Sequence, residues 1–295
     1  MQSLEALKRK IGSAEDLQSV VSTMKTLAAV SIRQYETAVE SLTDHVQTVE
    51  DGLRMALWHS SVPLQSPAVD RGTGAIVFGS DQGMCGQFNE QIVNYAIESL
   101  PRVKDGRDLW SFAAVGARAA LHLQEAGFHV DSELPVPGSA TGITPLVQDL
   151  LLKLDDWHTR RRFGRIVLYF NRRQSASSYH PHQMQLLPLD AKRVEQLKQR
   201  TWPARTLPMF TMGRSRLFSS LIHQYLFISL FRACAESLAG ENASRIASMQ
   251  SAERNIEERL AELRAGYNQL RQTSITEELL DVVTGFEALM QELKP

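Results

Sequence analysis

Apolar residues recur every three or four positions from Leu4 to Leu53, with polar residues between them. The spacing skips once, at Ala14, and no proline occurs before Pro63. A 3.5-residue period sustained over about 50 residues indicates the seam of a coiled coil, because an ordinary helix would rotate its apolar face away from its partner. The pattern therefore predicts one N-terminal coiled-coil helix within residues 1–60. Its seam positions are Leu4, Leu7, Ile11, Leu17, Val21, Met24, Ala28, Ile32, Tyr35, Val39, Leu42, Val46, Val49 and Leu53.

The same periodicity returns at the end of the chain and extends further. It follows the segment "TWPARTLP", continues over residues 221–270 and resumes over residues 279–289, without an intervening proline. The pattern predicts a second coiled-coil helix over residues 209–295, roughly 120 Å long if straight at 1.5 Å per residue.

Two heptad helices at opposite ends of one chain can bury each other's seams as an antiparallel pair. The alternative is that each helix dimerises with its copy in a second chain. We favour the intramolecular pair, because both helices must leave the same middle domain. Since the C-terminal seam is longer, about twenty of its last residues are expected to extend past Met1 as a single helix.

The middle of the chain, residues 72–195, alternates predicted strands and helices. This order is typical of a small α/β (Rossmann-like) domain around a mostly parallel sheet. Asn89 is a candidate N-cap of the first helix, and Gly127 is expected to end the second. The predicted strands are "GAIVFGS", "DLWSFAAVG" and "GRIVLYFNR", and the predicted helices are "NEQIVNYAIESL", "ARAALHLQEAG" and "TPLVQDLLLKLDDWHTRR".

The first strand runs into a glycine-rich turn, "GSDQGMCGQFN", over residues 79–89. Its spacing, G-x-x-x-G-x-x-G, differs from the dinucleotide fingerprint, and the carboxylate of Asp81 would repel a pyrophosphate. A P-loop requires a Lys and a Ser or Thr directly after its last glycine, and neither follows Gly86. Glycines also suit turns that need positive φ. We therefore expect a structural turn rather than a phosphate site.

Composition argues against several kinds of partner, metal site and location. Lys and Arg total 32 against 33 Asp and Glu, so the net charge of −1 does not favour nucleic acid. The only cysteines, Cys85 and Cys234, are far apart and lack metal-ligand spacing, which predicts neither disulfides nor a zinc site. The start, "MQSLEALKRK", lacks the apolar region of a secretory signal. The most apolar stretch, residues 219–231, is too short and polar for a bilayer span of about 20 residues. We expect a soluble cytoplasmic protein without cofactor or metal.

Three further groups of residues were considered as sites. His180 and His182 flank a proline with no carboxylate nearby, and we interpret them as surface loop histidines. Cys85 is interpreted as a small buried hydrophobe, because no partner base is evident. Cations at the end of a helix suit its dipole, so a solvated charged face is expected for the cluster of Arg160, Arg161, Arg162 and Arg165.

Several segments resemble the gamma subunits of rotary F-type ATP synthases, in order along the whole chain. "DQGMCGQFN" (81–89) is similar to the family turn D-[KR]-G-L-C-G-x-x-N. "ESLAGENASRIASM" (236–249) and "YNQLRQTSITEELLDVVTG" (267–285) resemble its C-terminal helix, and "STMKTLAAVSIRQYE" resembles its N-terminal helix. Gln82, Met84, Thr26, Ser31 and Gln269 depart from the pattern. These departures are those of a divergent member and would suit a second, variant F-type complex, and the expected lack of a transit peptide favours a bacterial source.

The resemblance implies a central-stalk rotor subunit that couples ion flow through the membrane rotor to ATP synthesis or hydrolysis in the alpha/beta ring. It implies a non-catalytic subunit without a cofactor. The implied partners are the alpha and beta subunits, the epsilon subunit and the c-ring, with the coupling ion a property of other subunits. The implied location is peripheral, at the cytoplasmic face of a bacterial cell membrane.

The resemblance also implies roles for individual residues. The family turn, which would shape the foot of the rotor, is matched by Asp81, Gly83, Cys85, Gly86 and Asn89. For each contact residue the alternative is an ordinary exposed helix position. The positions that match contacts with the beta subunit are Arg271, Gln272, Thr276, Glu278, Met24, Lys25 and Arg245.

Two other classes of protein remain as alternatives. An α/β nucleotide-binding enzyme with coiled-coil dimerisation arms would need a phosphate site, which the turn does not provide. A free coiled-coil scaffold would leave the "RQTSITEE" segment unexplained.

Overall fold

The computed structural model describes residues 3–57, 72–100, 110–175, 178–190, 195–196, 199 and 209–292, with side chains up to residue 286. The chain divides into two compact units. One unit comprises Met1–Leu27 with Ser248–Pro295, and the other comprises Ala28–Ala247.

The unit of residues 28–247 contains a five-stranded sheet in the order β3-β2-β1-β4-β5. Strands β3, β2, β1 and β4 are parallel to their neighbours, and β5 is antiparallel to β4. The mostly parallel sheet and the three predicted strands are therefore confirmed. The strands are β1 (Thr73–Phe78), β2 (Trp110–Val115), β3 (Val130–Leu134), β4 (Arg165–Arg173) and β5 (Tyr179–Leu187).

The two edge strands, β3 and β5, were not predicted. Strand β3 is "VDSEL", which lacks an apolar run, and β5 contains Pro181, which an edge strand tolerates because one side of its backbone has no ladder to complete. The expectation that His180 and His182 occupy a surface loop is wrong, since both lie on β5. The ring of His182 packs edge-on against Phe170, with 5.1 Å between ring centroids, and burial lowers the pKa of this histidine.

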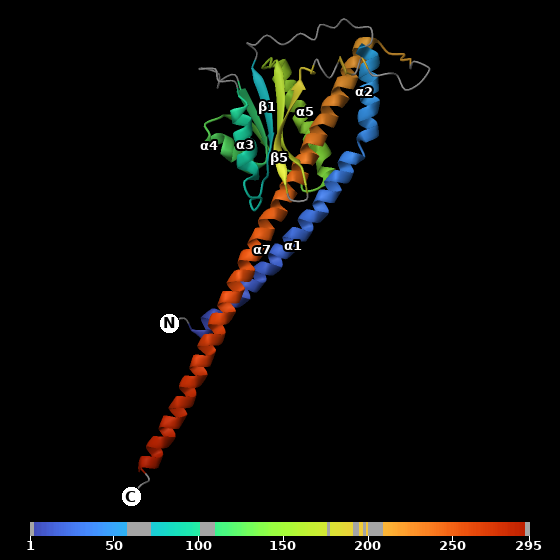
Figure 1. The fold of residues 1–295 in the computed structure, drawn as a ribbon. Coiled ribbons are helices and arrows are strands. Elements are labelled where there is room, and N and C mark those ends of the chain that lie inside the picture. The colour runs from blue at the N-terminus through green and yellow to red at the C-terminus, as the bar shows by residue number, and fades with distance from the viewer. Residues whose placement is uncertain are drawn as a thin grey trace. The chain divides into compact units, whose positions relative to one another are not determined.

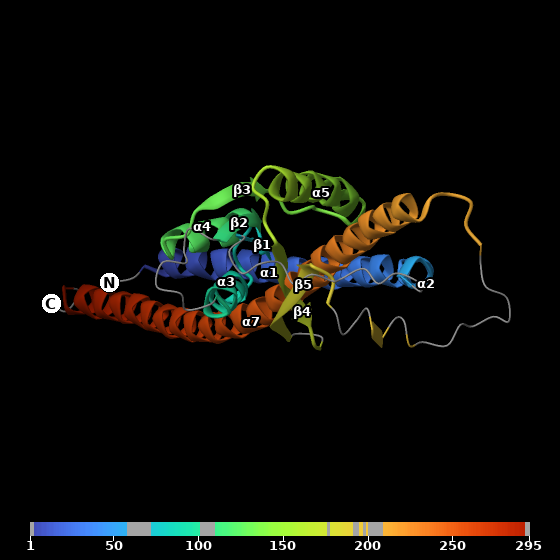
Figure 2. The same cartoon turned by 90° about the horizontal axis from the view of Figure 1, so that it is seen from above.

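Helices cover both faces of the sheet (Figure 1; Figure 2). One face packs against α3 (Phe88–Glu98) and α4 (Ala117–Glu125). The opposite face packs against α5 (Ile143–Thr159), which follows the short 3-10 turn η2 (Ala140–Gly142). Because both faces are buried, the central strands are continuously apolar. Gly127 ends α4 as predicted: its φ is +81°, and the next N–H, from Phe128, donates to the carbonyl of Leu123.

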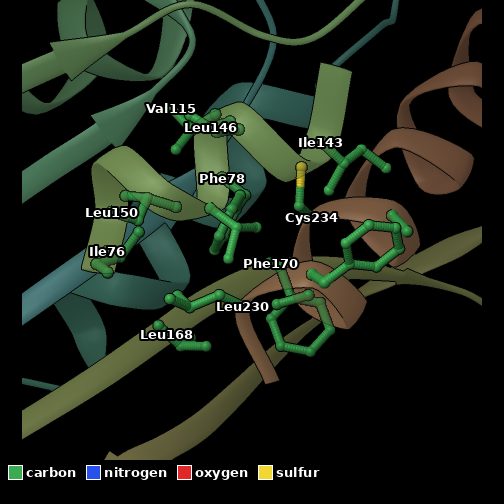
Figure 3. Close-up of a cluster of buried hydrophobic side chains, with 14 of the residues drawn as sticks. Ile76, Phe78, Val115, Ile143, Leu146, Leu150, Leu168, Phe170, Leu230 and Cys234 are labelled. Atoms are coloured by element: carbon green, nitrogen blue, oxygen red, sulfur yellow. The ribbon is translucent and has the colours of Figure 1, made fainter. Parts of the chain in front are cut away.

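The C-terminal helix α7 (Arg214–Glu292) contributes to the core beside α5. Leu230 and Cys234 of α7 lie among Phe78, Ile143 and Phe170 in this cluster (Figure 3). By length and composition α7 is the one described helix that could cross a membrane. A share of 33% of this apolar stretch of α7 is buried, where the helix packs against the sheet.

The N-terminal helix is interrupted, whereas the sequence predicted one continuous helix. It consists of α1 (Leu4–Glu40) and α2 (Thr43–Leu57), separated by Ser41 and Leu42. The hydroxyl of Ser41 donates to the carbonyl of Ala38, at 2.8 Å, so the side chain competes for a helical acceptor. The apolar spacing continues across the break, and periodicity alone therefore could not reveal it.

The terminal helices pair with each other in one chain, as predicted. In the unit of residues 28–247, Val49 and Leu53 of α2 pack against Ile228 of α7. In the other unit, Nζ of Lys25 lies 2.5 Å from Oε2 of Glu253, and Arg264 is paired with Glu15 at 2.7 Å. Residue numbers rise along α1 as they fall along α7, so the pair is antiparallel.

No described residue of the rest of the chain covers the last described part of α7. Residues 275–286 are all exposed, including the predicted seam residues Leu279, Val282 and Phe286, which are 61%, 70% and 64% exposed. The expected extension of the longer helix is thus confirmed over these residues.

Cysteines introduced as Glu15→Cys and Arg264→Cys should be joined within one chain by a short bismaleimide, because the native side chains form an ion pair. The two native cysteines are buried and should not compete. The measurement is the mass of the crosslinked product under denaturing conditions.

A matched pair, Glu15→Cys with Leu280→Cys, should not react internally, since position 280 lies about 24 Å further along α7 at 1.5 Å per residue. Products of twice the chain mass from the first pair would contradict the intramolecular arrangement.

Candidate functional site

The turn between β1 and α3 is held by the carboxylate of Asp81. Its Oδ1 accepts a hydrogen bond from the N–H of Ala117 at 2.9 Å, and its Oδ2 accepts one from the N–H of Val136 at 2.8 Å. Ala117 is the first residue of α4, so the carboxylate lies where the helix dipole favours an anion. A phosphate group could take this position only by displacing Asp81.

Asn89 closes the turn from the other end. Its Oδ1 accepts the N–H of Ser80 at 2.8 Å, and its Nδ2 donates to the hydroxyl of Ser80, also at 2.8 Å. The prediction that Asn89 caps α3 is wrong: the helix begins at Phe88, and no side chain caps it. Because Asn89 already lies inside the first helical turn, its side chain bonds back to the end of β1.

The glycines of the turn have different roles. Gly86 has φ +57°, as predicted for a glycine in a structural turn, and Met84 shares this left-handed conformation at φ +62°. Gly79 instead permits a close approach, because a Cβ there would lie 2.4 Å from Cβ of Ala119. At Gly83 a Cβ would meet only one nitrogen of Arg118, at 4.0 Å. Two of the three glycines are thus explained by conformation or space.

Cys85 is a buried structural residue, as predicted. Its side chain is 1% exposed, and its Sγ lies 3.5 Å from the hydroxyl of Ser80. Burial raises the pKa of the thiol, against the opposing effect of the Ser80 hydrogen bond. The thiol therefore remains protonated and unreactive near neutral pH.

The four candidate contact residues on distal α7 lie on the surface. Arg271, Gln272, Thr276 and Glu278 are all exposed. The hydroxyl of Thr276 donates to the carbonyl of Gln272 at 2.9 Å, and within the described residues the guanidinium of Arg271 has no ion pair. The structure therefore leaves these side chains available to another molecule.

Lys25 and Arg245, by contrast, are already bound within the chain. The ammonium of Lys25 is paired with Glu253, and Met24 beside it is half-buried. The guanidinium of Arg245 donates to Oε1 of Glu241 at 2.5 Å and to Oδ1 of Asn242 at 3.2 Å, and its side chain is 16% exposed.

Glu241 was not anticipated from the sequence. Its side chain is almost fully buried, and its second carboxylate oxygen, Oε2, has no hydrogen-bond partner within the described residues. Burial raises the pKa of this carboxyl group, and the neighbouring charge of Arg245 opposes the rise. Only the family motif around Arg245 pointed to this part of α7.

The arginines after α5 are not a uniformly solvated face. Arg160 forms an exposed pair with Asp156, as that expectation requires. Arg161, however, donates to the buried carboxylate of Asp131 and to the hydroxyl of Ser111, both at 2.7 Å. At 43% exposure Arg161 is still partly solvated, as expected, but its ion pair with a buried carboxylate on a distant strand was not predicted. Among the described residues, no three His, Cys, Asp or Glu side chains form a group suited to a metal ion.

Comparisons with known proteins agree with this architecture. Residues 3–289 match the family model described as ATP synthase. The chain is similar to the ATP synthase gamma chain of Nostoc sp., at 28% identity over 324 residues, covering 98% of this chain and 100% of that protein. It is also similar to the ATP synthase gamma chain of Granulibacter bethesdensis, at 28% identity over 301 residues, with coverage of 98% and 100%.

Two solved structures from Euglena gracilis share the fold. The mitochondrial ATP synthase structure of OSCP, F1 and c-ring matches with a TM-score of 0.67 and 16% identity, covering 99% of this chain and 96% of that chain. The rotor structure of the mitochondrial ATP synthase matches with a TM-score of 0.64 and 13% identity, covering 92% and 98%.

Replacing Asp81 with alanine should lower the free energy of unfolding by about 1–2 kcal/mol, because two backbone N–H groups lose a charged acceptor at an exposed site. The measurement is the urea midpoint followed by tryptophan fluorescence. Glu257→Ala, at an exposed position of α7, is the control and should change stability by less than about 0.5 kcal/mol. Equal effects of the two substitutions would show that Asp81 does not stabilise the turn.

Proposed function

The chain belongs to the gamma-subunit family of the ATP synthases, and on this premise we propose how it works as the central-stalk rotor. The observation that carries the proposal is an antiparallel pair of terminal helices, one of which packs on the α/β sheet and continues as a stretch that no described residue covers. Such a shaft has no threefold symmetry. Each catalytic site of a surrounding ring would therefore meet a different face and be held at a different affinity.

The chain itself is proposed to be non-catalytic. The turn at the C-terminal end of β1 is the position where a nucleotide would be expected in an α/β fold. Here that turn contains Asp81, whose carboxylate accepts the N–H groups of Ala117, at the start of the neighbouring helix α4, and of Val136, and would repel a pyrophosphate placed beside it. Nucleotide chemistry is accordingly assigned to the ring, and the chain contributes only differential contacts.

The proposed partners follow the two units of the chain. The alpha and beta subunits would surround α1 and distal α7, where exposed apolar residues such as Leu279 and Phe286 need cover. The α/β domain would meet the epsilon subunit and the c-ring, in line with neighbours described as rotor and OSCP/F1/c-ring assemblies. Through the complex, the chain would be peripheral at the cytoplasmic face of a bacterial membrane.

Arg271 and Gln272 are the strongest proposed contacts with the beta subunit. Both are exposed on α7, and a guanidinium fork suits paired carboxylates of a facing loop. Thr276 and Glu278 extend the same polar stretch. Met24, Lys25 and Arg245 are weaker candidates, because engaging beta would require Lys25 and Arg245 to share or release Glu253 and Glu241.

Purification of tagged chain from its native membranes tests the proposal. Alpha, beta and epsilon subunits should be recovered in a complex that hydrolyses ATP. Recovery of the chain alone, or only with copies of itself, would favour the scaffold alternative.

Arg271→Ala should leave assembly intact and slow ATP turnover per assembled complex roughly tenfold or more. The reason is the loss of a charge-assisted contact of about 1.5–3 kcal/mol, formed in one rotary state only. The measurement is the ATPase rate normalised to the amount of beta subunit recovered.

Two variants on the same helix serve as comparisons. Arg259→Ala removes an equal charge that is paired with Glu262, and should have little effect on turnover. Leu263→Ala truncates a buried seam residue and should reduce recovery of the complex rather than its specific rate. Unchanged turnover in the Arg271→Ala complex would refute the proposed contact.

A further inference from the structure

Three residues on one face of α7 meet main-chain carbonyl groups of the sheet domain. The hydroxyl of Ser237 donates to the carbonyl of Phe78, at the end of β1, over 3.4 Å. The hydroxyl of Ser244 donates to the carbonyl of Cys85, in the glycine turn, at 2.5 Å. Gly240 lies between them. Spacings of three and four residues place all three on the same side of the helix, here called the joint face.

Gly240 allows the backbone of α7 to lie directly against β4. A Cβ at this position would be 2.9 Å from the carbonyl oxygen of Asn171 and 3.5 Å from its carbonyl carbon. Both are backbone atoms, which cannot move aside as the end of a flexible side chain could. Any larger residue must therefore separate the helix from the strand.

The carbonyl groups that meet the joint face are themselves held in place. Asp81 and Asn89 fix the turn to α4 and to the end of β1, as described above. The amide of Asn171 donates to the carbonyl of Phe88 at 3.0 Å, tying β4 to the start of α3. Both ends of each contact are thus anchored, one in the domain and one in the helix.

We propose that the joint face, Ser237, Gly240 and Ser244, is where torque passes between the α/β domain and the helical shaft. This rests on the proposed function as a rotor. Apart from one partly exposed ion pair, between Glu236 and Arg172 of β4 at 3.4 Å, the surrounding contacts of α7 with the core are apolar and non-directional. They resist separation of the helix from the sheet, but they oppose rotation about the helix axis only weakly.

The geometry of the joint face supplies the missing directionality. The two hydroxyl bonds lie about 10 Å apart along the helix axis, on either side of the close approach at Gly240. Turning the helix by one residue, about 100°, would break both bonds and drive a neighbouring side chain into β4. Ser237 and Ser244 contact no partner subunit in this proposal. They fix the rotation of α7 against the sheet, so they are positioning residues.

The test uses the assembled complex in sealed membrane vesicles and the double variant Gly240→Ala/Ser244→Ala. Two quantities are measured together: the ATP hydrolysis rate and the membrane potential that hydrolysis generates, followed with a potential-sensitive dye that responds to either coupling ion. Hydrolysis should continue, because the shaft still turns inside the ring. The potential generated per ATP should fall about fivefold, the bias that one buried hydrogen bond gives an equilibrium.

A matched double variant, Gly266→Ala/Ser220→Ala, controls for changes in helix propensity and in hydroxyl content. A Cβ at Gly266 meets nothing within 4 Å, and Ser220 is exposed. This variant should keep the ratio of potential to hydrolysis found for the unsubstituted complex.

An unchanged ratio of membrane potential to ATP hydrolysis in the joint variant would overturn the proposal. This includes the case in which both quantities fall in proportion, because that result indicates only a less stable complex. If the double variant fails to assemble, Ser244→Ala alone decides by the same ratio, with Ser220→Ala as its control. Failure of the rotor function itself is distinguishable, since the unsubstituted complex would then generate no potential from ATP.

Discussion

The close packing of α7 on the sheet is the contact on which the unit of residues 28–247 depends. One helix supplies apolar side chains, such as Leu230 and Leu238, to the core and then small residues to the carbonyl ends of β1 and β4. An interior packed at crystal-like density transmits force without yielding. The part of α7 within this unit is therefore packed into the domain rather than attached at its surface.

Elements with a sustained apolar pattern were predictable from the sequence. The seam from Leu4 to Leu53 predicted the N-terminal helix, though not its break at Ser41 and Leu42, and the apolar run "GAIVFGS" predicted β1. The extension of distal α7 beyond the pair was also predictable, because the apolar seam of α7 is longer than that of the N-terminal helix. Arg271 is exposed, which suits a contact residue and an ordinary surface position equally, so its role stays a prediction.

Interactions between distant segments carried no local signal. The sequence predicted a surface cation at Arg161, and the structure pairs it with the buried carboxylate of Asp131. It predicted a helix cap at Asn89, whose side chain instead bonds Ser80. Strand β5 was predicted as a loop because it contains Pro181. A proline is tolerated in a strand at the edge of a sheet, and the sequence does not show which strand is at the edge. The pairing of Arg245 with Glu241 was likewise invisible, although both lie in a motif that the sequence singled out.

The carboxylate of Asp81 has a consequence for a machine that works among nucleotides. In many α/β domains a helix N-terminus at the carboxyl edge of the sheet binds a phosphate group of a ligand. Here the chain carries its own permanent occupant, bonded to Ala117 and Val136. The turn is therefore held by a group of the chain itself, so its conformation does not depend on capturing an anion from solution.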